Sequence, residues 1–153
     1  MSRAEMARQA TKDSAGAHEE FLMSESPSVP VIAVVDDDES VRESLAGLAD
    51  SVGYATALFD SAEEFLKSGR RRTDLDCLIL DVRLPGMSGV ELHNQLTTAG
   101  WFVPTIFITA YPDPLLATRP SVLTVLYKPF RPEVLLESVR IAISQSRRFT
   151  NPS

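Results

Sequence analysis

Five short apolar runs divide this chain, and their spacing limits the folds that it can form. Each run has the length of a strand, and together they occupy residues 31–35, 54–59, 77–80, 103–109 and 122–127. The run at 77–80 is apolar at every position, which is typical of a strand buried on both faces. Because segments with helical features separate most of the runs, the sequence predicts a parallel sheet with helices on both faces.

The segments between the runs carry recognisable signals for the start and end of helices. Apolar residues recur at helical spacing from Val41 to Val52, and Gly53 ends that helix. Three further segments predict helices: a capping box at 61–64, the stretch 88–96, and the stretch 132–145 with a proline in its first turn.

A length of 153 residues is typical of a single domain. Residues 1–28 are polar and rich in small side chains, which predicts a disordered N-terminal extension. The natural start is either Met1 or Met23, which lies close to the first apolar run. We expect the folded domain to occupy residues 29–145 and a flexible C-terminal tail to occupy residues 146–153.

Composition excludes several classes of protein. The net charge is −6 and the basic cluster at 70–72 is short, which argues against a nucleic-acid-binding surface. The single cysteine, Cys77, excludes an intrachain disulfide and a multi-cysteine zinc site. Because no apolar run approaches membrane-spanning length and the N-terminus lacks a signal-peptide core, we expect a cytoplasmic protein without a membrane partner.

Four of the five apolar runs end next to a side chain that can do chemistry. Three carboxylates, Asp36, Asp37 and Asp38, follow the first run, and Asp81, Thr109 and Lys128 mark the ends of three others. In open parallel sheets, ligands bind outside the carboxyl ends of the strands, so these groups should meet at one edge.

Each of these groups has a part in a possible phosphoryl transfer. Crowded carboxylates repel one another, and a bound Mg²⁺ relieves that repulsion. Asp81 can act as a nucleophile that forms an acyl phosphate. Lys128 and the metal would neutralise charge on the phosphoryl group, and the Thr109 hydroxyl would hydrogen-bond to it. Taken singly, Asp38 suits a helix N-cap, Thr109 a strand end and Lys128 the protein surface, so the inference depends on their coincidence.

The motifs around these positions resemble those of a bacterial response-regulator receiver domain of the FixJ type. The resemblance covers about residues 29–144, and the residues that carry it lie at 34–42, 80–89, 108–110 and 128–130. It implies a flavodoxin-like (βα)5 three-layer sandwich in the α/β class, with strand order 2-1-3-4-5. Because only residues 146–153 follow the last predicted helix, we also expect a stand-alone receiver, similar to chemotaxis regulators.

The resemblance assigns a role to each site residue. Asp81 would accept a phosphoryl group from a sensor histidine kinase or a phosphotransfer protein. Asp36, Asp37, Asp81 and the Val82 backbone carbonyl would hold Mg²⁺, with Asp37 the more direct ligand. Thr109 would be the switch hydroxyl and Lys128 the cation that pairs with the phosphate, after which the chain would signal through an unknown downstream protein. The Lys128–Pro129 peptide is expected to be cis.

Two features depart from the family pattern. The segment 110–127 is short and contains three prolines, which leaves room for one or two helical turns in place of the fourth helix. Val125 stands where receivers usually carry an aromatic side chain that follows the threonine. Residues 146–153 are too few for a helix-turn-helix, so no DNA binding is expected.

Three hypotheses follow for the function. The first is a switching phosphoacceptor that is not an enzyme. The second is a non-switching pseudo-receiver that acts as a constitutive protein-binding module, which Val125 and the prolines favour. The third, a phosphohydrolase, ranks last because Arg83 occupies the position where a second acid would serve the leaving group.

Overall fold

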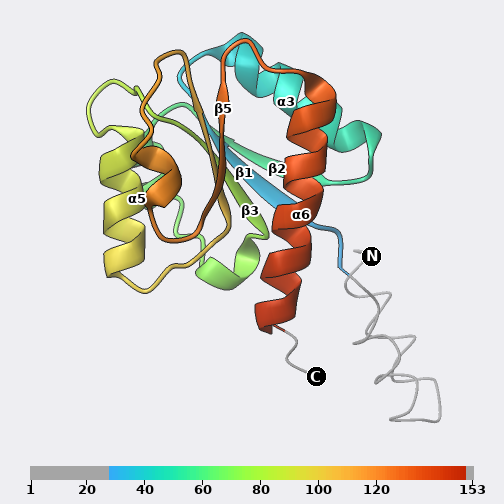
Figure 1. The fold of residues 1–153 in the computed structure, drawn as a ribbon. Coiled ribbons are helices and arrows are strands. Elements are labelled where there is room, and N and C mark those ends of the chain that lie inside the picture. Colours follow the sequence, from blue (N-terminus) through green and yellow to red (C-terminus); the bar gives the residue numbers. More distant parts are fainter. Residues whose placement is uncertain (1–27, 151–153) are drawn as a thin grey trace, which may run out of the picture.

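The computed structural model describes residues 28–150, with side chains up to Arg147. Its five strands form one parallel sheet in the order β2-β1-β3-β4-β5 (Figure 1). The strands are β1 (Val31–Val35), β2 (Ala55–Phe59), β3 (Cys77–Asp81), β4 (Thr105–Thr109) and β5 (Val122–Tyr127). The predicted N-terminal extension and the choice between Met1 and Met23 lie outside the described residues.

Helices cover both faces of this sheet. They are α3 (Glu39–Ser51), α4 (Ala62–Lys67), α5 (Gly89–Thr98) and α6 (Pro132–Thr150), with short 3₁₀ turns η1 (Arg72–Asp74) and η2 (Leu116–Thr118). In Figure 1, α5 lies on the opposite side of the sheet from α3 and α6. This arrangement confirms the flavodoxin-like three-layer fold that the sequence predicts.

Alternate strand residues build two separate hydrophobic layers, as the two-residue period of a strand requires. Leu78, Leu80 and Phe107 pack with α4, α5 and η2, whereas Ile79, Ile106 and Ile108 pack with α3 and α6. Because β3 and β4 are buried on both faces, their positions and the direction of their carboxyl ends are fixed by the core. None of the helices in residues 28–150 is long and apolar enough to cross a membrane.

The structure shows one predicted helix cap and corrects one local prediction. Ser61, the first residue of the predicted capping box, caps α4 by accepting a hydrogen bond from the Glu64 amide at 3.0 Å. Helix α6 ends at Thr150 rather than at Gln145, so the prediction of a flexible tail is wrong for 146–150. Arg147 pairs with Asp76 at 3.3 Å and donates to the Ser28 carbonyl at 2.7 Å, contacts that hold the added turn against the sheet.

The glycine that begins α5 allows the helix to start directly against β3. A Cβ atom on Gly89 would lie 2.0 Å from the carbonyl oxygen of Asp81. We therefore expect Gly89→Ala to lower the free energy of unfolding by about 3 kcal/mol, since the backbone of β3 or α5 would have to move. Urea denaturation measures this change.

A glycine in α3 supplies the control for that substitution. Gly47 has nothing within 4 Å of a built Cβ, so Gly47→Ala should stabilise the chain by up to about 1 kcal/mol through helix propensity. Equal stability of Gly89→Ala and the unsubstituted chain would show that this close approach is not a constraint.

Candidate phosphoacceptor site

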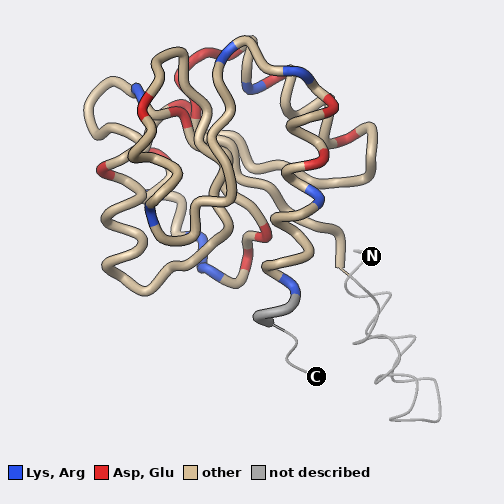
Figure 2. Tube along the Cα trace, viewed as in Figure 1, with Lys and Arg blue, Asp and Glu red and all other residues tan. Residues whose placement is uncertain are grey.

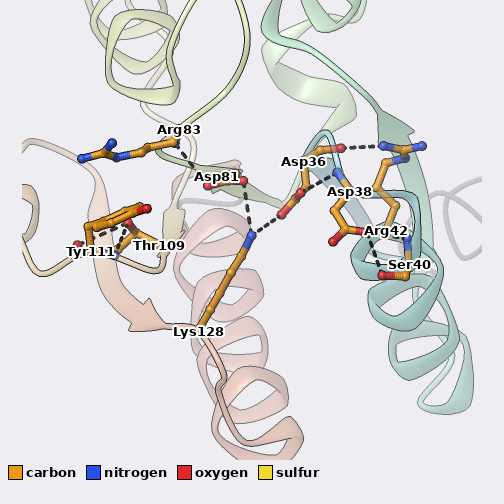
Figure 3. A network of polar contacts seen from close by, with 9 residues as sticks. All are labelled: Asp36, Asp38, Ser40, Arg42, Asp81, Arg83, Thr109, Tyr111 and Lys128. Atoms are coloured by element: carbon orange, nitrogen blue, oxygen red, sulfur yellow. Dashed lines mark hydrogen bonds and ion pairs between the residues drawn. The ribbon is translucent and has the colours of Figure 1, made fainter.

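The predicted site residues meet at one edge of the sheet, beyond the carboxyl ends of four strands. The parallel register sets Val35 beside Leu80, Asp81 beside Ile108 and Thr109 beside Tyr127. Asp36 and Lys128 directly follow β1 and β5, so their side chains reach the same space as Asp81 (Figure 3). Acidic and basic residues both occupy the loops at this edge, in the upper part of Figure 2.

Lys128 joins the two buried carboxylates of the site. Its Nζ lies 3.0 Å from Asp36 Oδ2 and 3.3 Å from Asp81 Oδ2, while Asp36 and Asp81 are 0% and 6% exposed. Burial by itself would lower the pKa of Lys128, but the hydrogen bond with Asp36 and the charges of both carboxylates outweigh it and raise the pKa. The lysine is therefore charged at neutral pH and supplies the fixed cation of the site.

Asp81 is held in an environment that disfavours its charge. Burial raises the pKa of its carboxyl group, the charge of Asp36 adds to the rise, and Lys128 and the Arg83 amide offset part of it. Two carboxylates share one lysine here, so a second cation would relieve the remaining repulsion.

Three carboxylates are arranged so that they fit a small divalent cation. One oxygen each from Asp36, Asp37 and Asp81 lies within 4.8 Å of the others. Asp37 is exposed, which leaves the cluster open to water on one side. Mg²⁺ prefers carboxylate oxygens together with several waters, so these residues suit it as predicted.

Asp38, the third acid of the run, has a structural role. Its Oδ1 accepts hydrogen bonds from the Ser40 amide at 2.9 Å and the Ser40 hydroxyl at 2.7 Å, which makes it the N-cap of α3. The Asp38 amide in turn donates to Asp36 Oδ1 at 2.9 Å. The backbone of the capping residue therefore also holds the buried Asp36 carboxylate in place.

Two predicted site atoms bond elsewhere in this structure. The Thr109 hydroxyl accepts from the Tyr111 amide at 3.1 Å and donates to the Tyr111 carbonyl at 3.2 Å. The Val82 carbonyl accepts from the Gly89 amide at 2.9 Å, which directs it at the first turn of α5. The metal-ligand role of Val82 and the switch role of Thr109 stay predictions.

Sequence reasoning missed a stacked pair beside the acceptor. The Arg83 amide donates to Asp81 Oδ1 at 3.2 Å, and its guanidinium lies 3.9 Å from the centre of the Tyr111 ring (Figure 3). Each residue lies two positions after a site residue, Asp81 or Thr109, and that spacing is the one signal in the sequence for their proximity. The Lys128–Pro129 peptide is cis, as expected.

Comparison with known proteins shows which family this chain belongs to. A family model described as the response regulator receiver domain matches residues 32–140. The chain belongs to the response regulator receiver family. Response regulator protein TodT of Pseudomonas putida (strain F1) is 39% identical over 121 residues, which cover 77% of this chain and 53% of TodT.

Further relatives give the same assignment. Transcriptional regulatory protein FixJ of Azorhizobium caulinodans is 39% identical over 122 residues, or 78% of this chain and 57% of FixJ. The structure of the response regulator StyR matches with a TM-score of 0.75 and 39% identity, covering 80% of this chain and 63% of the StyR chain. This chain spans about half the length of the curated relatives that it matches.

The receiver departs from the usual pattern in the segment between β4 and β5, where the short turn η2 takes the place of a helix. Leu116 of η2 is buried, and Arg119 donates from Nε to His93 Nδ1 of α5 at 3.1 Å and from its guanidinium to Asn94 Oδ1. Burial and the charge of Arg119 lower the pKa of His93 to about 4, so the histidine stays a neutral acceptor at neutral pH. The segment is thus fastened to α5.

Proposed function

We propose that this chain is the phosphoacceptor of a two-component system. Asp81 accepts a phosphoryl group from a sensor histidine kinase or phosphotransfer protein, with Mg²⁺ held by Asp36, Asp37 and Asp81, and the chain signals to a partner protein in the cytoplasm. The observation that carries the proposal is the buried Asp81 carboxylate, whose Oδ2 lies 3.3 Å from Lys128 beside two further acids.

The chemistry is a transfer between two nucleophiles. An oxygen of Asp81 attacks phosphorus, the bond from phosphorus to the donor histidine nitrogen breaks, and the electron pair and then a proton go to that nitrogen. Lys128 pairs with the arriving phosphoryl oxygens, and the Arg83 amide holds the other carboxylate oxygen of Asp81. Bound Mg²⁺ would supply charge neutralisation on the phosphoryl group.

The chain acts as an acceptor and not as a hydrolytic enzyme. Arg83, at the position where a hydrolase would use a second acid, points its guanidinium at Tyr111 instead. When Thr109 turns to the phosphoryl group it gives up its bonds to Tyr111, which is 54% exposed and available to a partner. Amide exchange at Tyr111 that is unchanged by phosphorylation would remove it from the signalling surface.

Neighbouring acids provide a matched test of the acceptor function. Incubation of the full chain with acetyl phosphate and Mg²⁺ should add one phosphoryl group, detected by intact mass, and EDTA should prevent it. Asp37→Asn should raise the Mg²⁺ concentration needed by at least about tenfold, because it removes a ligand.

Asp38→Asn is the control, since asparagine caps a helix as well as aspartate does. It should keep the Mg²⁺ requirement of the unsubstituted chain. No adduct on the unsubstituted chain at any Mg²⁺ concentration would contradict the proposed function.

A further inference from the structure

A glutamate outside the acid cluster reaches across to the loop that follows Asp81. Glu63 lies in the first turn of α4, and its Oε2 accepts a hydrogen bond from the Met87 amide at 2.9 Å. Its other oxygen, Oε1, is buried and has no hydrogen-bond partner among residues 28–150. Glu63 as a whole is half-buried, and the hydrogen bond from the Met87 amide lowers the pKa of its carboxyl group, so the contact with the loop favours the charged form.

The loop is shaped to receive this carboxylate. Gly86 has a φ of +73°, and a Cβ there would lie 2.5 Å from Glu63 Oε2 and 3.3 Å from its carboxyl carbon. Glycine at this position therefore serves both the left-handed turn and the close approach of Glu63. The Glu63 carboxylate therefore packs directly against Gly86 and Met87 of the loop at residues 82–88.

The same loop sets the orientation of the acceptor. Its first residues hold the Asp81 carboxylate through the Arg83 amide, at 3.2 Å, and join β4 through the Val82 amide, at 3.1 Å. For residues 84–87, the bond from Met87 to Glu63 is the one backbone hydrogen bond found within the described part of the chain. Loss of that bond would release the middle of the loop.

We infer that Glu63 is a positioning residue for the phosphoacceptor site: by anchoring the 82–88 loop it fixes the Asp81 carboxylate and thereby sets the Mg²⁺ affinity and the phosphorylation rate. The inference rests on the proposed function. Glu63 acts through Met87 and Arg83 and touches neither Asp81 nor the phosphoryl group.

The next residue of α4 gives a matched control. Glu64 has the same charge in the same helical turn, so its loss removes the same interaction with the helix dipole. The neighbouring Asp60 raises the pKa of the Glu64 carboxyl group, and within residues 28–150 no hydrogen bond joins that group to the loop. Glu63→Ala should weaken Mg²⁺ binding and slow phosphorylation by acetyl phosphate by about tenfold. Glu64→Ala should change both by less than about threefold, a margin set by the modest size of exposed charge effects.

The conservative variant separates positioning from charge. Glu63→Gln keeps an oxygen that can accept from Met87, so it should restore both quantities to within about threefold of the unsubstituted chain. Faster amide exchange at Met87 and Arg83 in Glu63→Ala, and not in Glu63→Gln, would support the loop as the route. Glu63→Gln that behaves as Glu63→Ala overturns the inference.

A double substitution tests the same contact from the loop. Gly86→Ala should weaken Mg²⁺ binding, and the loss should be smaller in a Glu63→Ala background, where the collision with Oε2 is gone. Mg²⁺ affinities of Glu63→Ala and Glu64→Ala that are equal overturn the inference. A chain that binds Mg²⁺ but takes no phosphoryl group overturns the proposed function, and the Mg²⁺ affinities then still decide the role of Glu63.

Discussion

Asp81→Asn should lower phosphoryl incorporation from acetyl phosphate by at least about 100-fold, to the background of the assay. The amide keeps the shape of the side chain and an oxygen for the Arg83 amide, but it is a poor nucleophile towards phosphorus. The measurement is intact mass in the presence of Mg²⁺, followed by the lability of the adduct in base and its stability in acid. An adduct that persists in Asp81→Asn would place the acceptor on another side chain.

The stability of the same variant shows whether the loss reflects chemistry or misfolding. The folded-state pKa of Asp81 is raised, so the group favours folding when protonated, and that contribution is lost as pH rises through the folded pKa. At neutral pH without metal, the carboxylate is therefore a net cost, and Asp81→Asn should raise the free energy of unfolding by about 1 kcal/mol. The difference should shrink as pH falls towards the ordinary value of 3.8.

With Mg²⁺ present, the unsubstituted chain should become more stable than Asp81→Asn. A cation at 100 times its Kd stabilises the unsubstituted chain by about 2.7 kcal/mol, and Asp81→Asn lacks one of the ligands. Thermal unfolding with EDTA and with Mg²⁺ gives both comparisons. If Asp81→Asn were less stable than the unsubstituted chain in EDTA at neutral pH, the repulsion assigned to Asp81 and Asp36 would be wrong.

The main positions of the site follow from sequence because a parallel sheet carries strand ends to a common edge. Asp36, Asp81, Thr109 and Lys128 each come directly at the end of an apolar run, and the register of β1, β3, β4 and β5 then places them together. The strand order follows from the motifs at these same ends only through the family that they resemble.

Contacts between separate loops could not be predicted in this way. Three contacts join segments whose approach depends on the folded loops. They are the hydrogen bond from Met87 to Glu63, the stacking of Arg83 on Tyr111 and the hydrogen bond from Arg119 to His93. The end of α6 is wrong in the sequence prediction for a similar reason. No glycine or proline directly after Gln145 marks where the helix stops. The contacts of Arg147 with Asp76 and Ser28, which hold the last turn in place, exist only after the sheet has formed.

Replacing the lysine of the site should expose how the two buried carboxylates depend on it. Among residues 28–150, Lys128 is the cation that forms ion pairs with both Asp36 and Asp81. The pKa of Lys128 is raised in the folded state. Its contribution to the free energy of unfolding is therefore complete below pH 10.5, the ordinary pKa of lysine, and is lost only as the pH rises further. At neutral pH in EDTA, Lys128→Met should lower the free energy of unfolding by about 2 kcal/mol, less than for a fully buried pair because the lysine side chain is 25% exposed.

The metal should compensate for this loss, since a divalent cation bound by the same carboxylates supplies the missing positive charge. We therefore expect Mg²⁺ to stabilise Lys128→Met more than it stabilises the unsubstituted chain, by about 1 kcal/mol. Lys67→Met, which removes an exposed lysine at the end of α4, should change neither quantity. Equal stabilisation by Mg²⁺ in all three proteins would contradict this prediction. It would mean that Lys128 and the metal do not neutralise the same two carboxylates, Asp36 and Asp81, despite the short distances between them.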